Sequence, residues 1–149
     1  MDNMRFVILT PYKRLLDISG VDEICIPTEL GIIGVLYGHA PMVTAIKTGV
    51  VWYTRSSEHN ISSFYKVAGG VAEITSTSVT LLVDVGEEAA EIDLARAKRA
   101  FERAEGRLAA KELGNIEVKR AESAKDRAMA RIQAAELHAS KNTKAAQGK

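Results

Sequence analysis

Residues 79–104 read VTLLVDVGEEAAEIDLARAKRAFERA, and their composition changes abruptly at Gly86. Before Gly86 the residues are mostly β-branched or apolar, as in a buried strand. After Gly86 they are mostly Ala, Glu, Arg and Lys, which are strong helix formers. The change predicts a boundary between a strand-rich domain, residues 1–86, and a helical region, residues 87–149.

Upstream of this boundary the chain is a series of short apolar runs separated by turn residues such as Gly69-Gly70. The gaps are too short for crossover helices, so neighbouring strands are expected to be antiparallel. The pattern is typical of a sandwich or barrel of roughly eight to ten strands. The candidate runs are RFVILT, LLDIS, EICIPT, GIIGVL, MVTAI, GVVWYT, ISSFYKVA, GVAEIT and VTLLVD.

The region after Gly86 predicts an antiparallel hairpin of two helices. Asp93 is a suitable amino-terminal cap for the first helix, and Gly114-Asn115 suits a two-residue turn because both residues tolerate left-handed backbone. The second helix is expected over residues 116–137, with fraying of the polar tail from His138 onward. The apolar stripes are Leu94, Ala97, Phe101, Ala104 and Leu108, then Ala121, Ala124, Ala128, Ile132 and Ala135.

The stripes are rich in alanine, which predicts a thin interface. Each Ala in place of Leu forgoes roughly 2 kcal/mol of burial. Isolated helices of this length are also marginal in water. We therefore expect a hairpin that can open or redock.

Charge and composition narrow the function classes. Residues 1–86 hold 6 Lys/Arg and 8 Asp/Glu, whereas residues 87–149 hold 14 and 11. The small basic excess in residues 87–149 fits an acidic partner or a phosphate ligand better than nucleic acid. The alternative is that these charges only solvate the helix faces. Cys25 is expected to be a buried, reduced core residue. No run approaches the ~18 apolar residues of a membrane span, so any membrane association is expected to come through partners.

The sequence carries no motif for catalysis. It lacks GxxxxGK[ST], GxGxxG, GxSxG and HExxH, and its three histidines have no metal-ligand spacing. His39, in the turn GHAP, is expected to make a structural hydrogen bond. We therefore expect no catalytic residue and no metal site.

Arginines follow a stripe on each predicted helix. Folding the hairpin at Gly114-Asn115 places Arg103 beside Arg127 and Arg99 beside Arg131, so four guanidiniums would converge. Guanidinium groups recognise phosphates and carboxylates, which makes this an anion-site hypothesis. The alternative is a salt-bridged face that uses the nearby carboxylates Asp93, Glu102, Glu105 and Asp126.

Three segments together carry a resemblance to a known family. They are ELGI with GHAPMVTAIKTGV (residues 29–32 and 38–50), VAGGVAE (67–73) and VTLLVD (79–84). The chain resembles the epsilon subunit of the F-type rotary ATP synthase, of the bacterial and chloroplast type. This resemblance spans essentially the whole chain and implies a ten-stranded sandwich followed by a two-helix hairpin.

The resemblance implies a non-catalytic rotor subunit of the central stalk. The sandwich would bind the gamma subunit and the c-ring, and the complex would couple proton or sodium-ion flow to ATP synthesis at the cytoplasmic face of a bacterial plasma membrane. The hairpin would move between a compact form and an extended form that reaches the α/β catalytic head. There, basic residues would meet an acidic loop of the β subunit and restrain ATP hydrolysis.

The resemblance also implies site residues. IDLARA, residues 92–97, matches a motif of relatives that bind ATP on the compact form, so ATP is the expected regulatory ligand and no cofactor is required. The implied ATP-binding residues are Glu87, Asp93, Arg96, Ala97, Arg103, Arg127 and Arg131. The implied c-ring contacts are Glu29, Leu30, Gly31 and His39, and the contacts with the β-subunit loop are Arg99, Arg107 and Arg120.

The chain departs from the family pattern in one place. Residues 33–36, IGVL, are expected to lengthen the connection between ELGI and the GHAP turn, and Tyr37 replaces a proline. Two other function classes stay open from the residues alone: a free-standing ATP sensor, and an unrelated sandwich adaptor with a coiled-coil tail. Copurification with gamma and the α/β head would distinguish them.

Overall fold

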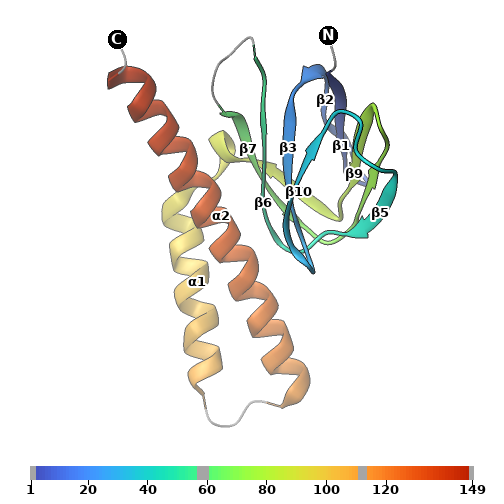
Figure 1. The fold of residues 1–149 in the computed structure, drawn as a ribbon. Helices are drawn as coiled ribbons and strands as arrows, with labels where there is room; N and C mark the ends of the chain where they lie inside the picture. Colours follow the sequence, from blue (N-terminus) through green and yellow to red (C-terminus); the bar gives the residue numbers. More distant parts are fainter. Residues whose placement is uncertain (1–2, 57–60, 111–113, 148–149) are drawn as a thin grey trace.

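The protein is a β-sandwich with a helical hairpin lying along one side (Figure 1). A computed structural model describes residues 3–56, 61–110 and 114–147. Within these ranges the chain forms ten strands, a short 3₁₀ helix and two α-helices. The strands are β1 Met4–Leu9, β2 Arg14–Val21, β3 Glu23–Thr28, β4 Gly31–Leu36, β5 Met42–Ala45, β6 Gly49–Thr54, β7 Ile61–Ala68, β8 Val71–Ile74, β9 Ser78–Leu82 and β10 Val85–Glu88.

The strands form two five-stranded sheets, in the orders β2-β1-β9-β8-β5 and β10-β7-β6-β3-β4. All pairs are antiparallel except β1 with β9, which run parallel. The predicted sandwich of about ten strands followed by a two-helix hairpin is therefore confirmed. The parallel pair places the first strand inside its sheet, between β2 and β9, a strand from the far end of the domain.

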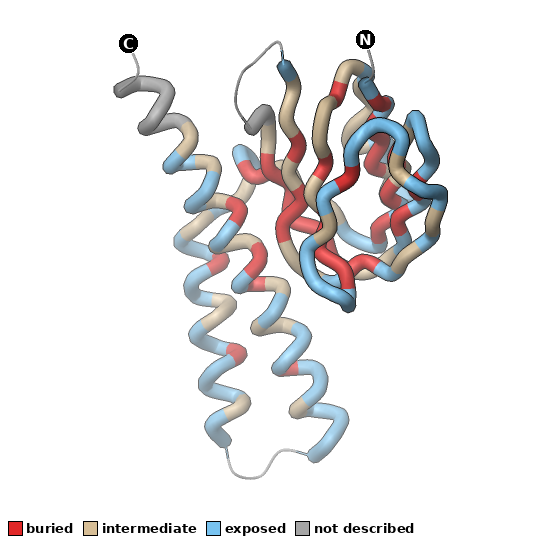
Figure 2. Tube along the Cα trace, viewed as in Figure 1, coloured by how far each residue is buried: buried red, intermediate tan, exposed pale blue. Residues whose placement is uncertain are grey.

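Alternation along the strands decides which side chains fill the sandwich. Ile24 and Ile26 of β3 are fully buried, whereas Cys25 between them is only half-buried. Across the core, Phe6 of β1 meets Tyr53 of β6 edge to face, with ring centroids 5.8 Å apart. Buried residues accordingly concentrate between the two sheets (Figure 2).

Cys25 differs from its expected place in the core because its strand position points to the outer face of the sheet. Burial, together with the Glu23 carboxylate, raises the pKa of the Cys25 thiol from 9.0 to about 11. A two-unit rise lowers the reactive thiolate fraction about 100-fold at neutral pH. We expect iodoacetamide to alkylate the native protein about 100-fold more slowly than the urea-unfolded protein, and equal rates would contradict this pKa.

The sandwich ends later than the sequence predicts. β10 pairs with β7, Val85 opposite Ala68 and Glu88 opposite Tyr65, so the last strand crosses the predicted boundary at Gly86. A 3₁₀ helix, Ala89–Glu91, then leads to α1. The sequence VGEE has little strand propensity of its own, and it is the pairing with β7 that makes it a strand.

Residues 33–36 are not the longer connection that the sequence suggests. They belong to β4, in register with β3: Ile33 lies opposite Ile26 and Gly34 opposite Cys25. The residues are β-branched or small and extend a regular ladder. The expected lengthened loop is therefore wrong, and Tyr37 lies in the turn that follows β4.

The hairpin consists of α1, Leu94–Ala109, and α2, Asn115–Gln147. Ala97 and Ala104 of α1 are buried, as are Ala121 and Ala128 of α2, so the predicted alanine interface is confirmed. The predicted two-residue turn is wrong, because α1 already ends at Ala109; residues 111–113 lie outside the described residues. α2 also runs to Gln147, beyond its predicted end near residue 137, since no glycine or proline interrupts it.

Helix α2 docks on the outer face of the sheet that contains β6 and β7, and α1 packs mainly on α2 (Figure 1). Ala134, fully buried, joins Val50 of β6, Phe64 of β7 and Ala89 in a second, small apolar cluster. Trp52 packs at its edge. The hairpin is thus held to the sandwich by few large side chains.

Candidate functional site

A cavity of about 360 Å³ lies where the hairpin meets the sandwich. Its walls come from the end of β10, the segment before α1, the first turns of α1, and α2. The volume lies within the range of small-molecule pockets, which begin near 300 Å³. Its lining residues are Glu87, Glu91, Ile92, Asp93, Arg96, Ala97, Ala100, Arg103 and Arg131.

Asp93 fixes the start of α1 at the edge of this cavity. Its backbone is extended, and its Oδ1 accepts a hydrogen bond from the Arg96 amide at 3.1 Å, which confirms the predicted cap. Arg96 and Arg103 are seven residues, or two helical turns, apart and therefore share a face. The cap thus positions both guanidinium groups toward the same space.

Six of the seven predicted ATP-binding residues line the cavity, and the exception is Arg127. Nη1 of Arg127 donates to Ser123 Oγ at 2.7 Å along α2. Arg99 does not line the cavity either and is exposed on α1. The expected convergence of four arginines is therefore wrong in its membership: Arg103 and Arg131 meet at the cavity, joined by Arg96.

One carboxylate links the sandwich to α2. Oε1 of Glu87 accepts from Arg131 Nε at 2.8 Å and lies 3.4 Å from Lys66 Nζ. Glu87 is part of β10, opposite Lys66 in the ladder with β7. This ion-pair cluster therefore joins residues that are distant in the sequence.

The predicted ATP-binding residues omit Glu91, Ile92 and Ala100 of the lining, and also Lys66, which lies behind Glu87. Lys66 follows Phe64 by two residues and therefore shares its face of β7. The neighbouring strand β6 carries the unbroken apolar run VVWY, residues 50–53. Unbroken apolar strands indicate a sheet covered on both faces. That signal could have placed Lys66 beneath the hairpin instead of in solvent.

The implied c-ring contacts do not form one cluster. Glu29 and Leu30 form the turn between β3 and β4, where the Leu30 side chain is 92% exposed. His39 follows the other end of β4, and its Nδ1 donates to the Ala40 carbonyl at 2.7 Å, as a structural turn residue would. The six residues of β4 separate the two turns by roughly 20 Å.

The hairpin surface carries the remaining predicted residues. Arg99, Arg107 and Arg120 are all exposed. Of the carboxylates in the alternative salt-bridged face, Glu105 lies 3.9 Å from Lys125 and Asp93 caps α1.

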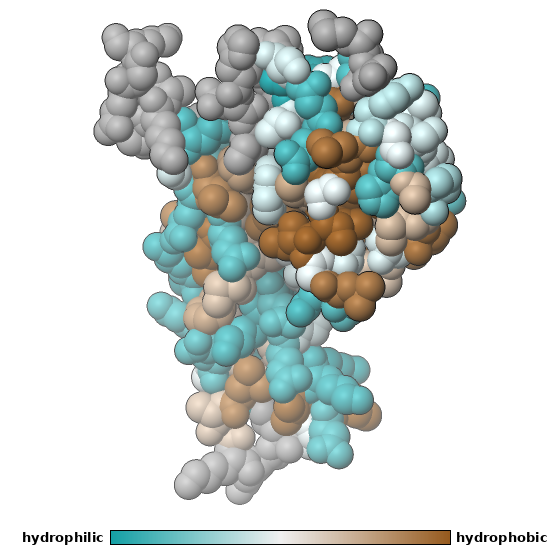
Figure 3. All heavy atoms as spheres, viewed as in Figure 1, coloured by the Kyte–Doolittle hydropathy of each residue, from teal (hydrophilic) through white to brown (hydrophobic). Residues whose placement is uncertain are grey.

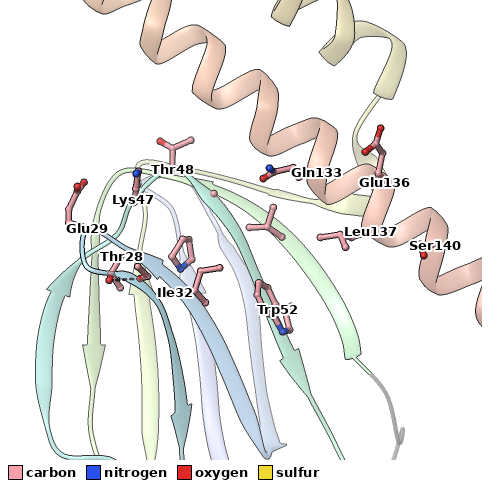
Figure 4. A pocket seen from close by; sticks show the side chains of 14 residues that line it. Thr28, Glu29, Ile32, Lys47, Thr48, Trp52, Gln133, Glu136, Leu137 and Ser140 are labelled. Atoms are coloured by element: carbon pink, nitrogen blue, oxygen red, sulfur yellow. Dashed lines mark hydrogen bonds between the residues drawn. The ribbon is translucent and has the colours of Figure 1, made fainter.

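A second, larger cavity of about 970 Å³ separates α2 from one end of the sandwich (Figure 4). Glu29, Lys47 and Thr48 lie on the sandwich side, while Gln133 and Leu137 point toward it from α2. This groove shows that α2 diverges from the sandwich around Leu137, beyond its contacts at Arg131 and Ala134.

The described parts of the chain hold no cluster of His, Cys, Asp and Glu side chains that could bind a metal ion. None of their helices combines the length and the apolar character that a membrane span needs.

Comparisons with known proteins agree on one family. Residues 3–89 match the beta-sandwich domain of the ATP synthase delta/epsilon chain, and residues 90–136 match its long alpha-helix domain. The ATP synthase epsilon chain of Geobacter sp. (strain M21) is 40% identical over 109 residues, which cover 73% of this chain and 76% of that protein.

Two solved structures share the fold. A chain in the Euglena gracilis mitochondrial ATP synthase, OSCP/F1/c-ring, has a TM-score of 0.74 at 20% identity, covering 85% of this chain and 77% of that one. A chain in the central stalk/c-ring of the Tetrahymena thermophila mitochondrial ATP synthase has a TM-score of 0.59 at 19% identity, covering 89% and 96%. The chain therefore belongs to the delta/epsilon family of F-type ATP synthases, as an epsilon subunit.

Proposed function

We propose that this non-catalytic subunit restrains ATP hydrolysis by the assembled synthase through movement of its hairpin, and that ATP bound in the arginine-lined cavity holds the hairpin docked. The observation that carries the proposal is the composition of that cavity. Glu87 comes from the sandwich, Arg96 and Arg103 from α1, and Arg131 from α2. A ligand bound in this space, between the sandwich and both helices, stabilises the docked arrangement by linkage.

Weak docking supports the proposed movement. The buried residues of the two helices, within the described ranges, are all alanines, and the apolar contact with the sandwich is a small cluster around Ala134. The groove beside Leu137 leaves the adjoining part of α2 without close packing on the sheet. An interface of this kind is expected to open more readily than the sandwich core.

The chemistry of the cavity suits a nucleoside polyphosphate. Three guanidinium groups line it, and each can form charge-assisted hydrogen bonds with phosphate oxygens. The capped amino terminus of α1 adds a favourable dipole for negative charge. Ile92 and Ala97 provide apolar surface for a base or sugar.

The remaining surfaces suit the partners that an epsilon subunit would meet. The sandwich exposes apolar side chains, including Leu30, Ile32, Leu36 and Val43, and apolar atoms gather on its visible face in Figure 3. We assign these surfaces to the gamma subunit and the c-ring, and the exposed arginines of the hairpin to the α/β head. The subunit would then lie peripherally at the cytoplasmic face of the bacterial plasma membrane, coupling proton or sodium-ion flow to ATP synthesis.

Calorimetric titration of the full chain with ATP tests the proposed ligand. We expect binding heat at or below millimolar ATP, and at least a 10-fold loss of affinity in Arg103→Gln, because this change removes a charged phosphate donor. Arg99→Gln is the matched control: it makes the same change on the same helix but outside the cavity, and its affinity should equal wild type.

Absence of heat at millimolar ATP, or equal losses in the two variants, would contradict ATP binding in this cavity. The proposal also predicts copurification with gamma and the α/β head, which a free-standing ATP sensor would not show. A tagged chain that binds ATP but never copurifies with gamma and the α/β head would favour that alternative instead.

A further inference from the structure

Lys66 is the one charged residue in the described parts of the chain that is fully buried. It lies on the outer face of β7, between Val50 of β6 and Glu87 of β10 in the two ladders. The docked α2 covers this face of the sheet. Lys66 therefore sits directly beneath the hairpin, although it does not line the arginine-lined cavity.

Burying an ammonium group is costly unless a carboxylate offsets it. Burial and the nearby Arg131 both lower the pKa of Lys66, while Glu87 opposes them by favouring the charged form. Lys66 Nζ donates to Glu87 Oε1, and the same oxygen accepts from Arg131 Nε. The carboxylate is thus held between two cations, one below it and one on α2.

The carboxylates that line the cavity oppose the binding of a polyphosphate, and Lys66 offsets the charge of one of them, Glu87. Glu87, Glu91 and Asp93 oppose Arg96, Arg103 and Arg131, so the lining is formally neutral. A carboxylate 2.8 Å from Arg131 would also repel the phosphates that this guanidinium is to bind. Lys66 adds a positive charge at Glu87 without occupying any of the cavity.

We propose that Lys66 is a positioning residue for polyphosphate binding: from beneath the cavity it holds and neutralises Glu87, so that Arg131 can donate hydrogen bonds to the phosphates of the ligand. This inference rests on the proposed ATP site and adds the residue that makes the site electrostatically suitable. Lys66 itself contacts Glu87, and its effect on the ligand is transmitted through that carboxylate.

The test compares ATP affinity in the wild-type full chain, Lys66→Met, and Lys66→Met combined with Glu87→Gln. Met keeps the length of the buried side chain but not its charge. We expect Lys66→Met to bind ATP at least 10-fold more weakly, because Glu87 is then neutralised by Arg131 alone. Removing the Glu87 charge as well should restore affinity to within about threefold of wild type.

Lys98→Met is the matched control, since Lys98 is exposed on α1 and does not line the cavity. It should bind as wild type does. A Lys66→Met protein that binds ATP normally would overturn the inference. So would a loss that Glu87→Gln fails to rescue, because that result would indicate a structural role only. Failure of the wild-type chain to bind ATP would instead refute the ATP site itself, and the inference with it.

Discussion

Replacing Ala134 by glutamate is expected to release the hairpin from the sandwich. Ala134 is fully buried in a cluster with Val50, Phe64 and Ala89, so a glutamate there would have to place a larger, charged side chain among these apolar ones. Burying an unpaired charge costs several kcal/mol, more than this small cluster can offset. Amide hydrogen exchange along α2 should become much faster, and ATP hydrolysis by the assembled synthase should fall because the extended form is favoured.

Ala95→Glu makes the same change at an exposed position of α1 and serves as the control. It should leave both exchange and hydrolysis close to wild type. If Ala134→Glu leaves α2 as protected as before, the hairpin is not held by this cluster. If α2 is released and hydrolysis does not fall, the proposed regulatory direction is wrong.

Gly70→Ala is expected to be the most damaging single-methyl change in the sandwich. Gly70 has φ +106°, and an added Cβ would collide with the Leu82 carbonyl oxygen and lie 2.8 Å from Val83 Cα. Backbone strain and overpacking of this kind each cost roughly 1–3 kcal/mol. We expect a loss of several kcal/mol in the free energy of unfolding, measured by urea denaturation.

Gly106→Ala is the matched comparison within the same chain. Gly106 lies inside α1 with no atom within 4 Å of an added Cβ. Alanine should therefore stabilise the helix, by up to about 1 kcal/mol. Equal effects of the two substitutions would contradict the close approach of Gly70 to β9 and its following residue.

The sequence predicted those parts of the fold that depend on local pattern. The run of short strands, the Gly69-Gly70 turn, the Asp93 cap and the alanine stripes all follow from propensity and periodicity, and all are present. Most of the predicted ATP-binding residues also line one cavity, because Asp93, Arg96 and Arg103 occupy one end and one face of a single helix.

The remaining features depend on partners distant in the sequence. β10 is a strand only because β7 pairs with it, and residues 33–36 join β4 because they continue the ladder with β3. A lysine in a strand is usually solvated, so Lys66 becomes buried only when α2 covers the sheet. Arg99 and Arg127 were misplaced because neither faces the cavity: Arg99 is exposed on α1, and Arg127 donates to Ser123 along α2.

The proposed regulation depends on ATP holding a weakly docked hairpin on the sandwich. Amide hydrogen exchange of the full chain within the assembled synthase, with and without ATP, tests it most directly. Without ATP, amides around Ala128 and Ala134 should exchange faster than those of β1 and β9, and ATP should slow them. Protection of α2 that equals the sandwich and does not change with ATP would contradict the claim.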